Sequence, residues 1–358
     1  MQLLFAHRKA VLGARHYLGS LLKGLGGRGH ACQIVVGYGP SLSYLRTLSD
    51  KSWWLPPLKG LARLQARRIL RRDRPDVAHV MLCGATFPLL GACKDAGVPV
   101  VVTLLSGKDL SPFLPDLASA ARIVVLHRAI FDYMLATYPS MADQFHLGSK
   151  LVDRGLFYPP EAPPPADGYR VVYMGRLSRS KGELALKVMD AVWQSREAIP
   201  GITLSVLGSG TRLLKVRARA KEINREAGRE VVSVRGGVTR PEEVLRQSDM
   251  VFAAGFSAAE ALACHCQVVG LGMGGLYGLV TPEGLDDALA ANFGDTLARW
   301  KAPTAEDIAA QLSAAYAARA ESREWMEDVF RGPLDPERVL DDYERVLTQA
   351  AQGKGCAT

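Results

Sequence analysis

The sequence has no long apolar run. None approaches the roughly 18 to 20 residues that a helix needs to span a bilayer. Residues 1–5 form only a short apolar stretch, which is followed by His7, Arg8 and Lys9. This start does not resemble a secretory signal peptide. We therefore expect a cytoplasmic protein, whose only membrane contact would be peripheral, at the inner face of the plasma membrane.

Cysteines and clustered metal ligands are also scarce. The six cysteines are scattered through apolar segments, as expected of buried thiols in a reducing compartment. In the cluster Cys264-His265-Cys266 the spacing is too tight for the usual zinc pairs, and no second Cys/His pair lies nearby in the sequence. No Asp-x-Asp triplet occurs, so a bridging divalent metal has no obvious ligands. We expect no metal site and no cofactor.

The composition is that of a globular protein with a basic surface. A chain of 358 residues fits two domains of roughly 150 to 200 residues each. The balance of 44 Lys and Arg against 36 Asp and Glu gives a net charge of +8, which suits a phosphorylated substrate, nucleic acid or an acidic membrane. The basic segments lack interleaved aromatics and a recognition motif, which argues against nucleic acid.

Strand-like and helix-like segments alternate through both halves of the chain. This alternation predicts parallel sheets covered by helices on both faces. A proline-rich run over 158–166 interrupts the pattern, because proline supplies neither helix nor central-strand hydrogen bonds. We predict a first Rossmann-like domain over 1–158, a linker over 159–168, a second Rossmann-like domain over 169–335, a helix over 336–351 that returns toward the first domain, and a tail over 352–358.

One stretch of the second half has the residues of a nucleotide-sugar site. An apolar strand over 171–174 runs into Gly175-Arg176, Lys181-Gly182 opens a helix, and Glu260 stands near the start of a later helix. Two cations and a helix N-terminus can neutralise a diphosphate, and a carboxylate can accept hydrogen bonds from sugar hydroxyls. The alternatives are a solvated basic turn and a surface carboxylate favoured by the helix dipole.

Glycines lie at several predicted strand ends. The runs 208–210 and 272–275 are either tight strand-to-helix turns or turns whose backbone N–H groups approach phosphate or sugar oxygens. The segment 13–16, which includes Gly13, follows the first strand and reads as a loop whose backbone faces a ligand.

Taken in order, these motifs resemble the retaining nucleotide-sugar glycosyltransferases of the GT-B fold, specifically glycosyltransferase family 4. Segments similar to the family's first domain are Arg28-Gly29-His30, Arg74-Pro75-Asp76 and Gly97-Val98-Pro99. The resemblance implies an α/β fold of two doubly wound domains that face each other across a cleft, with a C-terminal helix docking back.

The resemblance also assigns residues to the donor. It implies that Arg176 and Lys181 act as catalytic cations on the diphosphate and that Glu260 holds the ribose. Further residues are implied at the diphosphate, namely Gly13, Gly274, Gly275 and Leu276, and at the base, namely Gly208, Gly237 and Val238.

The sequence departs from the family pattern at two places. Phe252 stands where a second Glu, eight positions before the ribose-binding one, usually contacts the transferred sugar. The His that usually follows the fourth strand is matched only by Ser106, although Gly107 and Asp109 look like the Gly-x-Asp that comes after it. Asp109 is our first candidate for a catalytic residue of the first domain; the others are Ser106, Lys108, His7, Arg15, His16 and His79.

A basic segment of the first domain points to the acceptor. Lys59, Arg63, Arg67 and Arg71 fall four residues apart, just after Trp53-Trp54. A basic helical face beside exposed aromatics attracts anionic lipid headgroups; the alternative is a solvated helix with two core tryptophans. The expected function is transfer of a hexose from a nucleoside-diphosphate sugar to a glycan or lipid-linked acceptor, without a metal and, by resemblance, with retention. A non-catalytic GT-B relative that binds a nucleotide sugar or glycan stays open.

Overall fold

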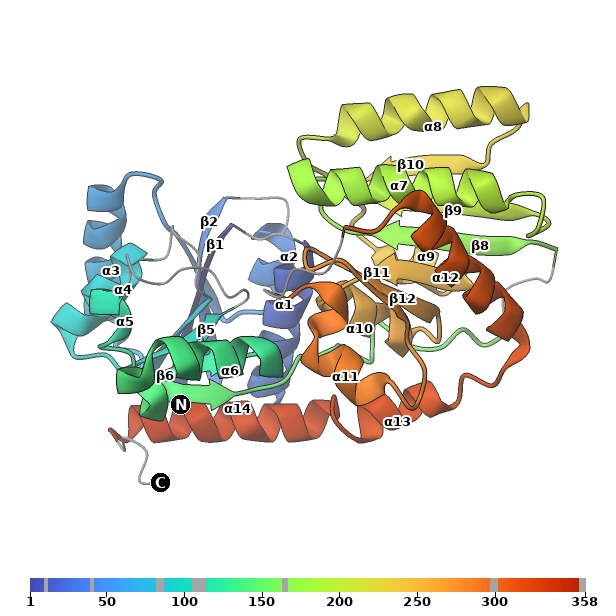
Figure 1. Cartoon of the computed structure of the whole chain (residues 1–358). Helices are drawn as coiled ribbons and strands as arrows, with labels where there is room; N and C mark the ends of the chain where they lie inside the picture. The colour runs from blue at the N-terminus through green and yellow to red at the C-terminus, as the bar shows by residue number, and fades with distance from the viewer. Residues whose placement is uncertain are drawn as a thin grey trace. The chain divides into compact units, whose positions relative to one another are not determined.

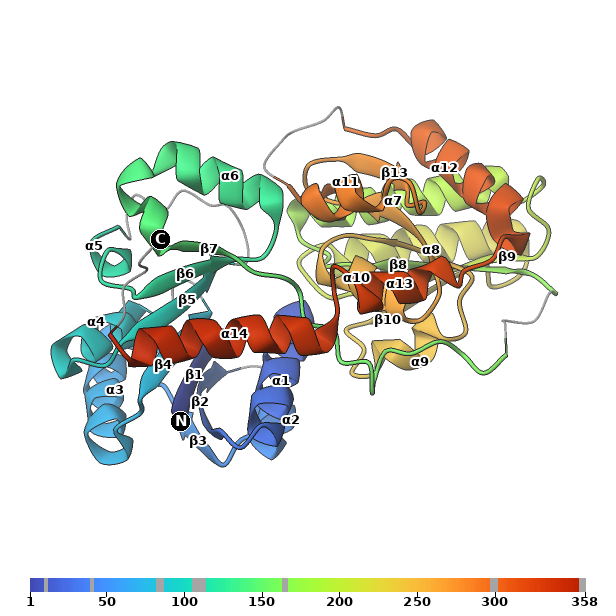
Figure 2. The ribbon, with the colours of Figure 1, turned by 90° about the horizontal axis from the view of Figure 1, so that it is seen from below.

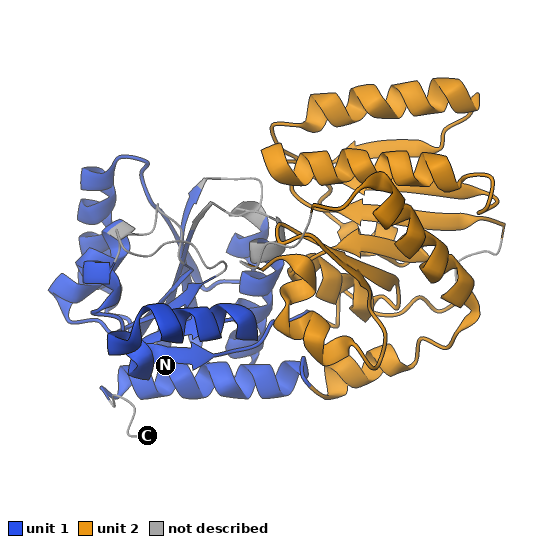
Figure 3. Cartoon of the chain, viewed as in Figure 1, with its two compact units in different colours: residues 1–153, 333–358 blue, residues 154–332 orange. Residues whose placement is uncertain are grey.

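The computed structural model describes residues 1–9, 12–38, 42–81, 87–104, 114–162, 167–296 and 302–353. The chain divides into two compact units (Figure 3). Unit 1 combines Met1–Asp153 with Pro333–Thr358, and unit 2 is Arg154–Gly332. Among the described residues, no helix is both long and apolar enough to cross a membrane.

Unit 1 is a parallel sheet with the strand order β3-β2-β1-β4-β5-β6-β7. Its strands are β1 (Gln2–Lys9), β2 (Ala31–Tyr38), β3 (Lys51–Trp54), β4 (Val77–Met81), β5 (Val100–Leu104), β6 (Arg122–Val125) and β7 (Phe145–Leu147). Its helices are α1 (Leu12–Gly27), α2 (Leu42–Thr47), α3 (Lys59–Asp73), α4 (Phe87–Ala96), α5 (Leu114–Leu117), α6 (Arg128–Thr137) and α14 (Pro336–Ala351), with a 3-10 helix η2 (Pro139–Gln144).

Both faces of this sheet are covered, because the central strands are apolar on both sides. In β4 and β5 every residue is buried. Alternate residues such as Ala78 and Val102 pack with α3 and α4 in one core. The opposite face lies against α1 and α14, and Figure 2 shows α14 running along it.

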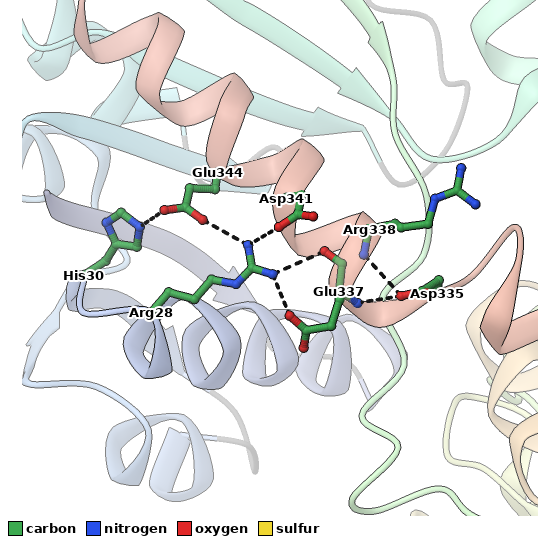
Figure 4. A network of polar contacts seen from close by, with 7 residues as sticks. All are labelled: Arg28, His30, Asp335, Glu337, Arg338, Asp341 and Glu344. Atoms are coloured by element: carbon green, nitrogen blue, oxygen red, sulfur yellow. Dashed lines mark hydrogen bonds and ion pairs between the residues drawn. The ribbon is translucent and has the colours of Figure 1, made fainter.

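The helix predicted over 336–351 is α14, and it belongs to unit 1. Asp335 caps it by accepting a hydrogen bond from the Glu337 N–H at 2.9 Å. At the end of α1, the Arg28 guanidinium lies 2.7 Å from carboxylate oxygens of both Glu337 and Asp341 and 2.9 Å from Glu344 (Figure 4). These carboxylates hold the pKa of Arg28 above its usual range.

Beneath α14 lies a buried chain of polar side chains. The Thr103 hydroxyl is 2.7 Å from His79 Nε2 and 2.8 Å from the Tyr343 hydroxyl, and Tyr17 donates a hydrogen bond to Tyr343. All four side chains are at most 1% exposed. Burial and the neighbouring His7 lower the pKa of His79 to about 3, so the imidazole is neutral. Because buried polar groups need partners, this series of hydrogen bonds fixes α14 on the sheet.

Unit 2 is a second doubly wound sheet, with the order β10-β9-β8-β11-β12-β13. Its strands are β8 (Tyr169–Met174), β9 (Ile202–Leu207), β10 (Val232–Gly236), β11 (Met250–Ala253), β12 (Gln267–Leu271) and β13 (Leu276–Leu279). Its helices are α7 (Arg179–Ser195), α8 (Leu213–Ala227), α9 (Pro241–Leu245), α10 (Phe256–Ala263), α11 (Leu285–Ala290), α12 (Ala305–Ala317) and α13 (Trp325–Arg331), with η3 (Asn292–Gly294) and η4 (Ala318–Ala320).

Of the strands that the structure describes in this sheet, only β13 runs antiparallel, paired with β12. Helices α7, α8 and α12 pack on one face in a single core, and Figure 1 shows α7 beside α8. The predicted fold class, two α/β units with doubly wound parallel sheets, is confirmed.

The division between the units falls earlier than the predicted boundaries. Unit 1 ends at Asp153 rather than at residue 158, because residues 154–158 are held by unit 2. Arg154 donates a hydrogen bond to the Ala263 carbonyl at 2.8 Å. Arg246 donates to the Leu156 carbonyl at 3.0 Å and stacks over the Tyr158 ring. Unit 2 ends at Gly332 rather than at residue 335. Residues 163–166 of the predicted linker lie outside the described residues.

Candidate functional site

The site begins at the carboxyl end of β8. The strand order places β8 beside β11, where the chain reverses its direction of winding across the sheet. Ligands of doubly wound sheets bind at this switch point, outside the carboxyl ends of the strands. After β8 the turn 175–178 leads into α7, and the N-cap residue Ser178 accepts a hydrogen bond from the Lys181 N–H.

Both predicted phosphate-binding cations lie at this turn and helix start. Arg176 is exposed, and in the described part of the chain it has no ion pair or hydrogen bond. Lys181 is in the first turn of α7, and its Nζ lies 2.9 Å from Asp295 Oδ2. That first turn contains no acidic residue. Since the helix dipole disfavours cations at an N-terminus, this arrangement favours an anionic ligand.

Asp295 lies at the candidate site through its ion pair with Lys181, and it was not predicted from the sequence. It follows η3, and its Oδ1 accepts a hydrogen bond from the Met273 N–H at 3.2 Å. In η3 the φ angles are 52° at Asn292, 56° at Phe293 and 89° at Gly294. A run of left-handed residues is rare outside glycine. The only local sequence signal is the pair Asn292 and Gly294, the residue types that tolerate this conformation.

The glycine-rich turn between β12 and β13 packs against η3. The Gly274 N–H donates to the Gly294 carbonyl at 2.9 Å, and the Gly275 N–H donates to the Gly272 carbonyl at 3.2 Å. A Cβ on Gly272 would lie 2.4 Å from the Gly294 oxygen. Two of the residues predicted at the diphosphate, Gly274 and Gly275, therefore have amides that already have acceptors. Leu276, the third, begins β13 and packs partly buried against the core.

Glu260 lies on α10, which follows β11 on the other side of the switch point. It is 2% exposed and surrounded in sequence by buried apolar residues, so the surface-carboxylate alternative is wrong. Gly255 caps the helix with a φ of 63° and donates its N–H to the Asn292 carbonyl at 3.1 Å. Glu260, Gly255 and η3 therefore belong to one connected region. The ribose-binding role of Glu260 stays a prediction.

Phe252 lies inside the core. It is fully buried in β11 and packs in the apolar cluster of unit 2. Only Ala254 and Gly255 connect β11 to α10. The position eight residues before Glu260 therefore cannot present any side chain to a ligand.

The turn after β9 has a packing reason for its glycines. A Cβ on Gly208 would lie 1.9 Å from the Gly175 carbonyl oxygen, and one on Gly210 would lie 2.3 Å from the Leu177 oxygen. The Leu177 N–H donates to the Ser209 carbonyl at 2.9 Å. These contacts support the tight-turn interpretation of this run, because the turns after β8 and β9 are packed backbone to backbone.

The remaining base-binding predictions fall at the end of the neighbouring strand. Gly237 is exposed and Val238 is partly buried, just after β10. A Cβ on Gly237 would lie 3.5 Å from Ser209. Gly208, Gly237 and Val238 are thus brought to one edge of the sheet, and their contact with a base stays a prediction.

The first-domain candidates fare unequally. Ser106, Lys108 and Asp109 lie outside the described residues. The expected loop over 13–16 is helical, because α1 already begins at Leu12, so the prediction of Gly13 in a loop is corrected. The four remaining candidates are all at most 8% exposed, namely His7, Arg15, His16 and His79.

The basic segment is α3, and it exposes leucine side chains as well as cations. Arg63 and Arg67 pair with Asp95 at 2.8 and 2.6 Å. Leu58, Leu61 and Leu64 are 65%, 55% and 52% exposed. Of the two tryptophans, Trp54 is 51% exposed, and Trp53 is partly buried, with Arg72 stacked over its ring. The cations were expected from the sequence, whereas the exposed leucines were not.

The cysteine cluster is occupied by other contacts. The four described cysteines, Cys32, Cys93, Cys264 and Cys266, are buried and free. The Cys266 thiol donates to the Leu245 carbonyl at 3.1 Å, and His265 Nε2 lies 2.9 Å from Glu327 Oε1. Within the described ranges, no group of three or more His, Cys, Asp or Glu side chains is arranged to hold a metal.

Comparison with known proteins places the fold. No family model matches the sequence, and no curated protein matches it. The structure is similar to a glycosyltransferase from Rickettsia africae, with a TM-score of 0.72 and 15% identity over 97% of this chain and 98% of that chain. It is also similar to Alr3699/HepE from Anabaena in complex with UDP and glucose, with a TM-score of 0.70 and 15% identity over 98% and 100% of the two chains.

A third similar structure is UDP-GlcNAc 2-epimerase from Neisseria meningitidis bound to UDP-GlcNAc, with a TM-score of 0.63 and 11% identity over 98% of this chain and 100% of that chain. At these identities the likeness concerns the fold. The chain has the GT-B fold, with two Rossmann-like units.

Proposed function

We propose that this chain is a glycosyltransferase that moves a hexose from a nucleoside-diphosphate sugar, with UDP as the first candidate nucleotide, to a hydroxyl of a glycan or lipid-linked acceptor. The observation that carries the proposal is the pair of cations, Arg176 and Lys181, at the N-terminal end of α7, whose first turn contains no acidic residue of its own. The pair lies at the switch point of a doubly wound sheet. The likeness to a fold that holds UDP and glucose in Alr3699/HepE supports the choice of nucleotide.

In this proposal the leaving diphosphate is stabilised by charge. Arg176 and Lys181 neutralise the oxygens on which negative charge grows as the sugar departs, and preorganised donors of this kind contribute several kcal/mol. Glu260 holds the ribose hydroxyls. Charge neutralisation by these side chains makes a metal unnecessary. Retention of configuration, membership of family 4 and a catalytic role for Asp109 rest on the resemblance of the motifs alone.

The α3 surface supports a peripheral membrane contact. We define the α3 patch as Leu58, Leu61 and Leu64 together with Lys59, Arg63, Arg67 and Arg71. Leucines that are more than half exposed beside cations match an anionic lipid surface, where a lipid-linked acceptor of a cell-surface glycan would be found. Leu61→Ser with Leu64→Ser should reduce sedimentation with phosphatidylglycerol vesicles, whereas Leu214→Ser, at a 79% exposed leucine of unit 2, should not. If the Leu61→Ser/Leu64→Ser variant sedimented with the vesicles as much as the Leu214→Ser variant does, the membrane contact would be excluded.

The nucleotide is tested by thermal shift against UDP, GDP, dTDP, ADP and CMP. A ligand at one hundred times its Kd stabilises the native state by about 2.7 kcal/mol, so one nucleotide should stand out. Glu260→Gln should then weaken calorimetric affinity for that nucleotide about tenfold, because a charge-assisted hydrogen bond is lost. Unchanged affinity would remove the ribose role.

Activity is tested with the matching nucleotide sugar and an alcohol or lipid acceptor. Release of the nucleotide together with a glycosylated acceptor supports the proposal. Saturable binding with no product in a long incubation would favour the non-catalytic relative. Conversion of the donor to its epimer would assign the chain to the other activity known for a similar structure.

A further inference from the structure

Asp295 is placed at the proposed diphosphate site by contacts to two elements. One carboxylate oxygen lies 2.9 Å from Lys181 Nζ on α7. The other accepts the Met273 N–H of the β12–β13 turn at 3.2 Å. The side chains of Lys181 and Asp295 are 22% and 30% exposed. The pair is thus partly shielded, yet it can be reached from solvent by a ligand.

The backbone before Asp295 is strained and firmly held. Asn292, Phe293 and Gly294 all have left-handed φ angles, which costs of order 1–3 kcal/mol for each non-glycine residue. The fully buried Phe293 side chain anchors the run, and the Asn292 and Gly294 carbonyls accept hydrogen bonds from Gly255 and Gly274. Strain of this kind persists only where the surroundings determine the conformation, and it clusters at functional sites.

This held backbone brings Asp295 to the start of α10. A Cβ on Gly255, the N-cap of α10, would lie 4.0 Å from Asp295 Oδ2. No carboxylate can come from the short connection between β11 and α10, because Phe252 is buried and only Ala254 and Gly255 follow β11. Asp295 therefore supplies a carboxylate beside a helix start that has none of its own.

We propose that Asp295 is a donor-site residue with two successive partners. Without a donor it neutralises Lys181; when the diphosphate binds Lys181, Asp295 is released and accepts hydrogen bonds from hydroxyls of the transferred sugar. This inference rests on the proposed function. The diphosphate displaces the carboxylate because it carries more charge and more acceptor oxygens.

The exchange has a consequence for turnover. When an intact nucleotide sugar is bound, hydroxyls of the transferred sugar replace Lys181 as hydrogen-bond partners of Asp295. The free nucleotide left after transfer no longer has this sugar. Asp295 then competes with the product diphosphate for Lys181. The carboxylate therefore favours binding of the donor over binding of the product and promotes product release.

The test compares UDP with UDP-glucose by titration calorimetry. Asp295→Asn should tighten UDP binding about five- to tenfold, because Lys181 loses its competing counter-ion. The preference for UDP-glucose over UDP should fall by at least as much. Asp190→Asn is the matched control: it also removes a carboxylate paired with a cation of unit 2, here Asp190 of α7 with Arg219 of α8 at 2.8 Å, and should change neither affinity.

A second comparison separates the counter-ion from a general charge effect. In a Lys181→Ala background, Asp295→Asn should leave UDP affinity unchanged. The inference is overturned if Asp295→Asn fails to tighten UDP binding, or if the tightening persists without Lys181. Should Asp295→Asn not fold, Asp295→Glu keeps the charge and displaces the carboxylate. It should preserve UDP affinity within twofold while lowering the UDP-glucose preference, and an unchanged preference would overturn the inference.

Failure of the proposed function gives a different result. In that case wild-type protein would bind neither UDP nor UDP-glucose, or Lys181→Ala would bind UDP as tightly as wild type. Either outcome concerns the donor site as a whole and removes this inference with it. A wild-type protein that needs Lys181 for UDP, combined with an indifferent Asp295→Asn variant, refutes the inference alone.

Discussion

The two units share a doubly wound parallel sheet, but they place polar side chains in opposite settings. In unit 1, His79, Thr103 and Tyr343 form a chain at most 1% exposed beneath α14. In unit 2, Lys181 and Asp295 form a partly exposed pair beyond the strand ends. Polar groups on the face of a strand hold a helix in place, whereas polar groups beyond its carboxyl end are available to a ligand. The comparison predicts that the first group governs stability and the second governs binding.

The largest effect is expected at the two cations of the proposed diphosphate site, the exposed Arg176 and the partly exposed Lys181. Lys181→Ala and Arg176→Ala should each lower transfer turnover about a hundredfold, because a charged donor to the leaving diphosphate is lost. The thermal unfolding midpoint should stay close to that of the wild type. Initial rates of nucleotide release, with the acceptor present, check this expectation. Wild-type turnover in both variants would refute the phosphate assignment.

Next in size is a change within the buried chain of unit 1. Tyr343→Phe removes a hydroxyl that is bonded to Thr103 and Tyr17, leaving both without that partner. The expected loss is about 2 kcal/mol of unfolding free energy, measured by urea titration. UDP affinity should not change. If the variant were as stable as wild type but bound the nucleotide differently, the assignment of stability to this group and of binding to the pair in unit 2 would be wrong.

A smaller effect is expected on the unfolding free energy at acidic pH. His79 has a lowered pKa in the folded state, so its stabilising contribution is complete above the unfolded pKa of about 6.5 and is lost as the pH falls below it. At pH 5.5 the loss is about 1.4 kcal/mol, because the unfolded chain takes up the proton and the folded chain does not. Urea titrations at pH 7.5 and 5.5 should show a steeper decline for wild type than for His79→Asn. Parallel declines would contradict a neutral buried His79.

The smallest effect is expected at the surface ion pairs between Arg28 and α14. Arg28→Ala removes ion pairs to Glu337, Asp341 and Glu344, whose side chains are 78%, 71% and 34% exposed. Exposed pairs contribute about 0–1 kcal/mol and are screened by salt. The change in unfolding free energy should therefore lie below that of Tyr343→Phe and shrink further in 0.5 M salt. A larger loss than for Tyr343→Phe would mean that α14 is held by the Arg28 ion pairs more than by the buried hydrogen bonds of Tyr343.

The parts of the site that sequence predicted are those determined locally. Arg176 and Lys181 follow a buried strand within a few residues, so a strand-turn-helix pattern locates them. Glu260 follows β11 just as closely. Asp295 escaped prediction because its position depends on backbone contacts from η3 to Gly255 and Gly274, which no local pattern shows.

The fold shows the same limit. The alternation of strand-like and helix-like segments predicted two parallel sheets with apolar central strands, but no strand was expected at the positions of β3, β7 and β13. These three have 4, 3 and 4 residues and lie at sheet edges, where partial exposure weakens the apolar signal. The unit boundary was displaced for a related reason, since the contacts of Arg154 and Arg246 join residues far apart in the sequence.

Because unit 1 contains α14, its two segments are synthesised at different times. Residues 1–153 are translated first and 154–332 follow before α14 is made. Until then Thr103 and Tyr17 lack Tyr343, and the face of the first sheet that lies against α1 and α14 lacks α14. Unit 2 is one continuous segment and can complete its fold during translation. The first part to be translated is therefore the last to mature, and it needs protection from aggregation for the longest time.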